Sequence, residues 1–196
     1  MISTNEIRAA CEGSWLLLRS RPEGMSYFDQ SLPGFWRSFQ VIFLLLPIFV
    51  LSAMAERNAI VAEADPSLGA FPENAYWWAK LLGFAASWIA LPLVLALLAG
   101  PIGLSRTYVP FVVARNWTSL LANMPFLLTA VLYLIGIIPT GIFVLLSITC
   151  LVMLLYYSYL VTRIALQTTI SLAIAVVALD VVLTLLIGEL ASRLFA

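Results

Sequence analysis

The side chain with the clearest chemical potential is Asp180, which lies inside the long apolar run from Thr168 to Gly188. A carboxylate near the middle of a membrane-spanning helix costs about 2.5–3.5 kcal/mol on insertion scales, and it normally faces the helix bundle or a water-filled cavity. The spacing of the apolar runs places no Lys or Arg at the same depth. We therefore expect Asp180 to lack a cationic partner and to donate a hydrogen bond as a neutral acid.

Several hydroxyl groups are predicted to share the depth of Asp180. They are Ser87, Tyr133, Ser147 and Thr149, with Thr184 one helical turn away. A proton-coupled carrier would use such a carboxylate, but so would a bundle that needs one polar contact to set its register, or a contact with another protein subunit. We favour a structural or subunit contact over transport.

Asn123 is the second candidate, because Pro125 leaves a backbone carbonyl free close to its side-chain amide. The simpler interpretation is a hydrogen bond within a proline-interrupted helix. The candidate intramembrane polar site is therefore Asp180, Asn123 and Thr184. Glu189 and Arg193 stand four residues apart and predict an ion pair on one helix face.

The sequence contains few of the residues and motifs on which enzymatic catalysis depends. The sequence has no histidine, no paired intramembrane carboxylates, no GxSxG motif and no phosphate-binding loop. Cys11 lies in a polar segment and Cys150 in an apolar run, so neither a disulfide between them nor a metal site is expected. We predict a protein that is not an enzyme and that holds no cofactor or metal.

Composition identifies the solvent that surrounds these residues. Of the 196 residues 63% are hydrophobic and 10% are charged, against about 45–50% and about 25% in soluble domains. Ten basic and ten acidic residues give zero formal charge, so nucleic acid is not an expected partner. The chain is therefore predicted to be an all-α, polytopic transmembrane helical bundle of about five spans.

Two parts follow from the hydropathy pattern. Residues 1–34 form a cytoplasmic amphipathic, interfacial segment, and residues 35–196 form the five-span membrane domain. The predicted spans are 36–54, 75–99, 120–136, 142–159 and 168–188. Because the first long apolar run begins only near Phe35, no cleavable signal is expected.

The segments outside the spans are predicted as follows. Residues 3–20 have helical periodicity, and the helix either lies on the membrane surface or packs on the bundle or a partner; both alternatives stay open. Residues 55–74 form an acidic loop, with a short helix near 57–64. Residues 104–119 form an interfacial or dipping segment.

Aromatic and basic residues at the ends of the runs indicate the membrane boundaries. The predicted interface anchors are Trp36, Arg37, Trp77, Trp78, Arg106, Arg115 and Trp117. With a cytoplasmic N-terminus, seven Lys or Arg residues fall inside and three outside. The positive-inside rule then predicts a multi-pass protein of the bacterial inner membrane with a cytoplasmic N-terminus and a periplasmic C-terminus.

Five spans after a polar N-terminus resemble the architecture of the Yip family of membrane proteins. The tract Tyr27-Phe28-Asp29 followed by residues 34–39 (GFWRSF) also resembles uncharacterised bacterial inner-membrane proteins, and residues 108–117 hold a second such tract. The Yip resemblance implies membrane trafficking and partner binding rather than catalysis. The other resemblance leads to a family without assigned chemistry.

These observations favour a scaffold, an accessory subunit or a membrane-organising factor. Its expected partners are the lipid bilayer and another membrane-protein subunit or a second copy of the chain. The alternative is a small solute or proton-linked carrier that uses Asp180. A carrier built from repeats should show matched halves, and we find no internal repeat.

Overall fold

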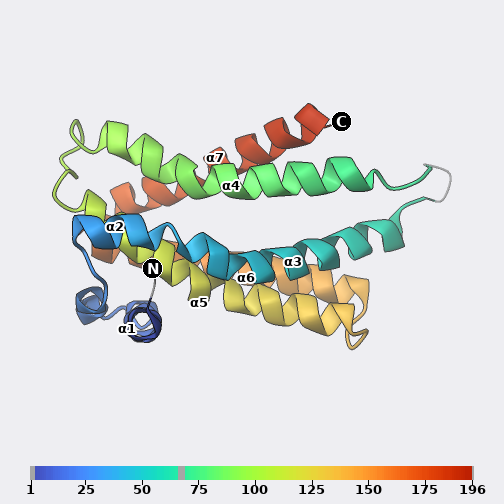
Figure 1. Ribbon diagram of the computed structural model, residues 1–196, viewed down its shortest axis with the longest axis horizontal. Coiled ribbons are helices and arrows are strands. Elements are labelled where there is room, and N and C mark those ends of the chain that lie inside the picture. The colour runs from blue at the N-terminus through green and yellow to red at the C-terminus, as the bar shows by residue number, and fades with distance from the viewer. Residues whose placement is uncertain (1–2, 66–68, 196) are drawn as a thin grey trace.

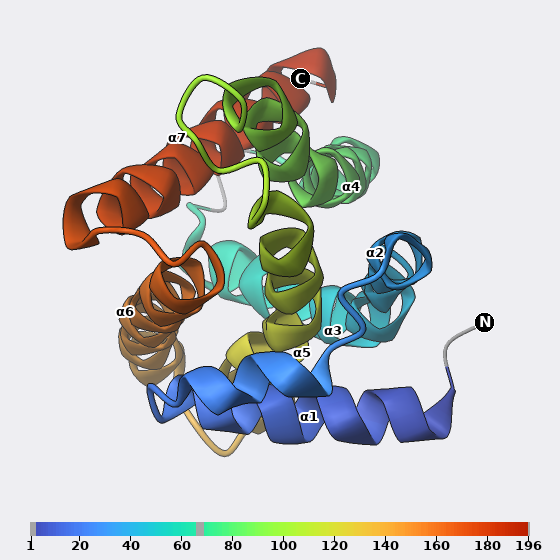
Figure 2. The same ribbon diagram turned by 90° about the vertical axis from the view of Figure 1, so that its left-hand side faces the viewer.

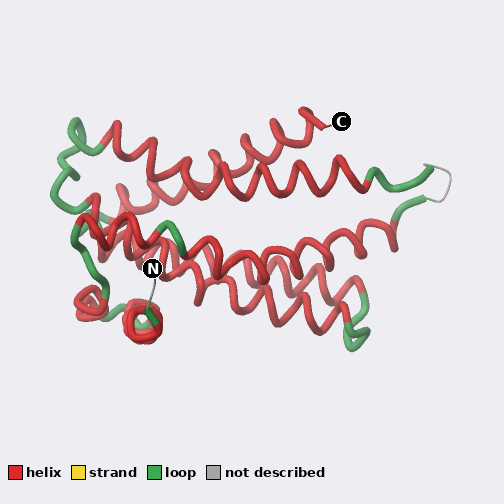
Figure 3. Tube along the Cα trace, viewed as in Figure 1, coloured by secondary structure: helices red, strands yellow, loops and turns green. Residues whose placement is uncertain are grey.

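Five long helices lie side by side and form an elongated bundle (Figures 1 and 3). The computed structural model describes residues 3–65 and 69–195, and every regular element in these ranges is helical. The long helices are α3 (Val41–Glu63), α4 (Glu73–Leu98), α5 (Tyr108–Leu134), α6 (Thr140–Ala165) and α7 (Ile170–Phe195). Each is long and apolar enough to cross a membrane, the short α2 (Leu32–Ser38) counting with α3. The predicted all-α bundle of five spans is confirmed.

Two predicted connections differ from the structure. Helix α3 continues to Glu63, so the helix predicted near 57–64 is present, but as the end of α3 and not as a separate helix within the loop 55–74. Residues 66–68 of that loop lie outside the described ranges. Helix α5 begins at Tyr108, so most of the predicted interfacial segment 104–119 belongs to the third span. Pro110 lies in the first turn of α5, where a missing backbone N–H removes no helical hydrogen bond. The segment was predicted to be interfacial because Arg115, which lies inside α5, is a residue type typical of a membrane boundary.

The long helices form two groups (Figure 1). Helix α5 packs closely against both α3 and α6, and we call these three the three-helix layer. Helix α4 packs most extensively on α7, and we call these two the helix pair. Long side chains join α3 to α4, because Lys80 contacts Glu56 with Nζ 2.6 Å from Oε1, and Arg57 pairs with Glu73.

Helix α1 (Thr4–Leu18) crosses one end of the bundle and lies crosswise to the long helices (Figures 1 and 2). We call this the α1 end, and the opposite one the far end. Ala10, Ser14 and Leu17 are buried against the bundle, and the Tyr157 hydroxyl donates to the Ser14 carbonyl at 2.6 Å. Of the two alternatives for residues 3–20, the structure therefore shows packing on the bundle.

Burial is concentrated toward the α1 end. The main hydrophobic cluster joins α1, α3, α4, α5, α6 and α7 there, whereas the smaller cluster at the far end comprises Ala55, Ala59, Ala130 and Phe143. Helix α7 ends at the far end, so α1 and the C-terminal helix end point to opposite sides of the bundle (Figure 1). The bundle is therefore closely packed at the α1 end and more open at the far end, and the polar candidate residues lie within this bundle.

Candidate functional site

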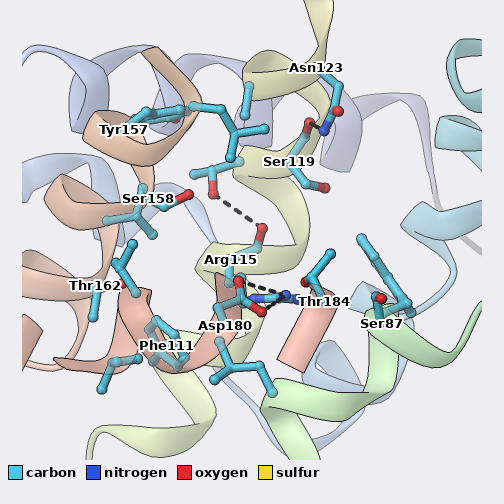
Figure 4. Close-up of a pocket in the computed structure, with 18 of the residues that line it drawn as sticks. Ser87, Phe111, Arg115, Ser119, Asn123, Tyr157, Ser158, Thr162, Asp180 and Thr184 are labelled. Atoms are coloured by element: carbon cyan, nitrogen blue, oxygen red, sulfur yellow. Dashed lines mark hydrogen bonds and ion pairs between the residues drawn. The ribbon is translucent and has the colours of Figure 1, made fainter. Parts of the chain in front are cut away.

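Asp180 is paired with Arg115. The Arg115 Nη2 atom lies 3.0 Å from Oδ1 and 3.2 Å from Oδ2 of Asp180, and the side chains are only 20% and 27% exposed. The pair connects α5 of the three-helix layer with α7 of the helix pair (Figure 4). The prediction that no cation reaches Asp180 was wrong, because it treated Arg115 as an anchor at the membrane boundary. Since α5 starts at Tyr108, Arg115 lies two turns inside the helix.

Helical spacing brings further polar groups to the pair. Arg115, Ser119 and Asn123 recur every four residues and share one face of α5, while Asp180 and Thr184 share one face of α7. Figure 4 shows both sets of side chains around one space, with Ser87 of α4 on the side of Thr184. The structure thus brings together all three residues of the predicted polar site.

These residues line a cavity of about 300 Å³, which we call the ion-pair cavity. Trp88 of α4, Thr118 of α5, and Tyr157, Ser158 and Thr162 of α6 complete the polar part of its wall. The remaining lining is apolar, and the volume is at the lower limit for small-ligand sites. The cavity therefore combines an apolar wall with a few convergent polar groups, as binding sites do.

The ion pair is the strongest electrostatic feature of this cavity. Its two charges cancel, so it presents a dipole rather than a net charge. Removing one partner of a fully buried pair costs about 3–5 kcal/mol. The effect here is at the lower end, because each side chain keeps a fifth or more of its surface exposed. The pair can hold the two helix groups together while it remains reachable from the cavity.

A second cavity adjoins the first. It measures about 820 Å³, lies between α3, α4 and α7 toward the far end, and is called the far cavity below. Phe84, Ser87 and Thr184 line both cavities. The two cavities therefore lie next to each other along the helix pair, from the ion pair toward the far end. A separate cavity of about 470 Å³ lies between α3, α5 and α6.

The other residues predicted at the depth of Asp180 lie elsewhere. Tyr133 contacts Thr140 at the hairpin between α5 and α6, with 3.2 Å between the hydroxyl oxygens. Ser147 lines the separate cavity, and the Thr149 hydroxyl donates to the Leu145 carbonyl within α6. These residues were grouped by their predicted depth in the membrane alone. The rotation of each helix about its axis points their side chains away from Asp180.

Two predicted hydrogen-bonding arrangements are present. The Asn123 amide donates to the Ser119 carbonyl at 2.7 Å, which is a bond within the proline-interrupted helix. Arg193 Nε lies 2.7 Å from Glu189 Oε1 on α7. Asn123 nevertheless also lines the ion-pair cavity, so its side chain combines a local backbone bond with a place in the site.

The predicted interface anchors divide into two sets. Trp36, Trp78 and Arg106 are exposed and Trp77 is half-buried, as expected for side chains at a membrane boundary. Trp117 is only 2% exposed and belongs to the main hydrophobic cluster, so its assignment as an anchor was wrong. Its indole fills the core between helices instead of reaching the lipid headgroups.

Arg37 holds the N-terminal segment in place. Its guanidinium contacts Glu6 of α1 at 3.3 Å and Asp29 at 2.5 Å. Hydrogen bonds from Ser31, together with the charge of Arg37, lower the pKa of Asp29 below its usual range. The sequence contained these residues in the tract from Tyr27 to Phe39, but no spacing rule links Glu6 to Arg37 across 31 positions.

The two tracts behind the second family resemblance contact each other. The Asn116 amide donates to the Ser38 hydroxyl at 2.9 Å, and both side chains are fully buried. The Phe35 and Tyr108 rings lie 6.0 Å apart, and the Tyr108 hydroxyl donates to the Pro92 carbonyl at 2.9 Å. These tracts therefore join α2, α4 and α5 at the α1 end, beside the ion-pair cavity.

No group of three or more His, Cys, Asp or Glu side chains suited to a metal ion occurs in residues 3–65 and 69–195. Comparisons with protein-family models, curated proteins and solved structures give no match. The two family resemblances stay predictions. The assignment of a function therefore depends on the geometry of the cavities.

Proposed function

We propose that this integral membrane protein is a small carrier whose binding site is the ion-pair cavity. One observation carries the proposal: the Arg115–Asp180 pair lines a cavity formed by five helices that shares wall residues with the far cavity. An intramembrane ion pair beside a lined space is the usual arrangement of ligand and ion pathways. The carrier was the less favoured prediction from sequence; the cationic partner and the cavity bring it forward.

The contacts between the two helix groups suit a moving part. Helix α4 is joined to α3 and α5 largely by side chains, including Lys80 to Glu56 and the Tyr108 hydroxyl to the Pro92 carbonyl. Helix α7 also packs on α6, and its Val176 belongs to the main hydrophobic cluster. The polar contacts of α4 can therefore exchange partners while α7 stays attached to α6. A ligand group or a proton that competes for Arg115 or Asp180 would loosen the helix pair from the three-helix layer.

The role that we propose is binding and passage, without catalysis. We also propose that the protein resides in a bacterial inner membrane with its α1 end in the cytoplasm, which the distribution of Lys and Arg supports. A C-terminal reporter enzyme that is active only in the periplasm should then be active. Activity of a cytoplasm-only reporter at the C-terminus would contradict this orientation.

A scaffold or accessory subunit is the second candidate. The observation in its favour is the exposure of α7, whose most apolar window is only 11% buried. Leu185, Leu190 and Leu194 are each about two-thirds exposed. Lipid covers such a face in a monomer, but a second membrane protein or a second copy of this chain would also fit it.

Thiol labelling separates these candidates without knowledge of the substrate. Thr184 lines both cavities, whereas its neighbour Leu185 is 67% exposed and lines neither. In a Cys11→Ser, Cys150→Ser background, Thr184→Cys should react with a charged, membrane-impermeant methanethiosulfonate, while Leu185→Cys should not. Equal resistance of both variants would show that charged molecules do not enter the cavity, and the carrier proposal would fail.

Flux in liposomes gives the second arm. A proton-linked carrier should acidify vesicles that contain a trapped pH-sensitive dye, and Asp180→Asn should abolish this flux while expression and folding persist. If the wild-type protein instead purifies with a stoichiometric partner that Asp180→Leu releases, the scaffold is correct. The charge-reversed variant Arg115→Asp, Asp180→Arg is the control for a purely structural role of the pair.

A further inference from the structure

The two adjoining cavities are both mostly apolar, and they differ in where the ion pair lies. The ion pair and most of the surrounding hydroxyls lie in the ion-pair cavity, nearer the α1 end. Phe49, Phe71, Phe84 and Phe195 contribute aromatic walls to the far cavity, which Tyr76, Lys80 and Ser192 also line. A fully hydrophilic solute would leave these aromatic walls unmatched. A molecule with a polar head for the ion pair and an apolar chain for the aromatic walls would match both cavities.

The polar part has donors without acceptors. Trp88 is 7% exposed and lines the ion-pair cavity, and its indole Nε1 finds no acceptor in the described chain. Asp180 contacts only Nη2 of Arg115, so the guanidinium has further N–H groups to offer. Indole and guanidinium can donate but cannot accept. A ligand here must therefore supply acceptor oxygens, as a phosphate or carboxylate does.

The far cavity has room for a chain because two residues in its wall lack side chains. A Cβ atom added at Gly83 of α4 or Gly188 of α7 would meet nothing within 4 Å. In addition, α3 and α7 are not among the helix pairs that pack closely in the described structure. A chain could thus enter between these helices from the side, out of the surrounding lipid.

We propose that the ligand is a bilayer phospholipid with an anionic headgroup, whose phosphate binds Arg115 and Trp88 and whose acyl chain follows the helix pair into the far cavity. This inference rests on the proposed carrier function and names its substrate class. Arg115 lies seven residues into α5, or about 10 Å at 1.5 Å per residue. The headgroup would therefore lie about 10 Å in from the α1 end of α5, and its chain would run on toward the bilayer centre, as chains of that leaflet do.

Photo-crosslinking tests the lipid. The full-length protein is reconstituted in phosphatidylcholine vesicles with a trace of phosphatidylglycerol that carries a diazirine on one acyl chain. The control is a phosphatidylcholine probe with the same chain. The anionic probe should label peptides of α4 and α7 at the far cavity at least five-fold more than the zwitterionic probe. Equal labelling by both probes would mean ordinary surrounding lipid and would overturn the proposal.

Two variants locate the labelling. Gly83→Leu with Gly188→Leu should fill the far cavity and reduce labelling at least five-fold, whereas Gly141→Leu, a glycine with equally open surroundings at the start of α6, should not. Arg115→Gln with Asp180→Asn removes both charges together and should bring the anionic probe to the level of the zwitterionic one. Arg106→Gln is its exposed control. Unchanged labelling in both double variants would place the lipid elsewhere.

The remaining outcomes separate the lipid from the carrier. If millimolar inorganic phosphate displaces the anionic probe, the ligand is a soluble anion and the lipid assignment is wrong. If labelling is unselective while Thr184→Cys reacts and flux persists, the lipid assignment fails but the carrier stands. Selective labelling without transfer of the probe between leaflets, and without proton flux, would support the lipid site and overturn the carrier function.

Discussion

The α1 end and the helix pair place their polar residues in different surroundings. At the α1 end, polar side chains bond across the chain, Asn116 with Ser38 and Arg37 with Glu6 and Asp29. Asn116 Oδ1 and the Ser14 hydroxyl are buried there and find no partner in the described residues. Along α4 and α7, polar side chains line cavities, and the Trp88 indole finds no acceptor in the described chain. An unmatched polar group is costly in a membrane, and the one at Trp88 lines a cavity in which a ligand can satisfy it.

The largest effect is expected where these two regions meet. Asp180→Leu leaves Arg115 unpaired among apolar helices and should destabilise the protein by about 3 kcal/mol. The double variant Arg115→Gln, Asp180→Asn should lose less, because it strands no charge. Thermal unfolding in detergent, followed by size-exclusion chromatography with fluorescence detection, measures both. Equal losses in the two variants would show that the cavity already solvates Arg115.

Two glycines compare close packing with open space. A Cβ at Gly13 would lie 2.8 Å from the Gly24 carbonyl oxygen and 2.8 Å from Tyr27 Cβ, whereas one at Gly83 meets nothing within 4 Å. Gly13→Ala should therefore destabilise the docking of α1 by about 1–3 kcal/mol. Gly83→Ala should stabilise α4 by about 0.5–1 kcal/mol. Limited proteolysis of α1 and apparent melting temperatures would reveal both; the same sign for both would refute the contrast.

Buried and cavity-lining polar groups should also differ. Asn116→Ala removes the buried partner of the Ser38 hydroxyl and should cost about 1–2 kcal/mol. Ser119→Ala, one turn along α5 in the cavity wall, should change stability by less than about 0.5 kcal/mol. The measurement is the apparent melting temperature of each variant in one detergent. A larger loss from Ser119→Ala would mean that the cavity also has a structural role.

The smallest effect concerns pH at the α1 end. The pKa of Asp29 lies below its usual value of 3.8, because Ser31 donates to its carboxylate and Arg37 is close. Its contribution is therefore complete above about pH 4 and is lost as the pH falls through the lowered pKa. Protease accessibility of α1 should rise slightly below pH 4 in the wild type. Asp29→Asn should be more accessible at neutral pH and should not show this step.

Hydropathy alone was sufficient to predict the five long helices and to single out Asp180, Asn123 and Thr184 as polar residues within apolar runs. Apolar length, helical periodicity and the burial cost of a carboxylate are local properties, so a single sequence carries them. The spacing of Arg115, Ser119 and Asn123 was also present, but their common face had no meaning until α5 was known to begin at Tyr108. The prediction of Arg115 as an anchor at the membrane boundary was wrong because the third span was expected to begin at residue 120, whereas α5 begins at Tyr108.

Only the tertiary structure decided which of these residues meet. Arg115 and Asp180 are 65 positions apart, and their contact depends on the rotation of α5 and α7 and on the pairing of α4 with α7. The burial of Trp117 and the docking of α1 depend on the same packing. The sequence determined that the Asp180 carboxylate needs a polar or charged partner inside the membrane. The arrangement of the helices decided that this partner is Arg115 and that the pair lines the ion-pair cavity. Side chains from distant spans become neighbours only when the helices pack.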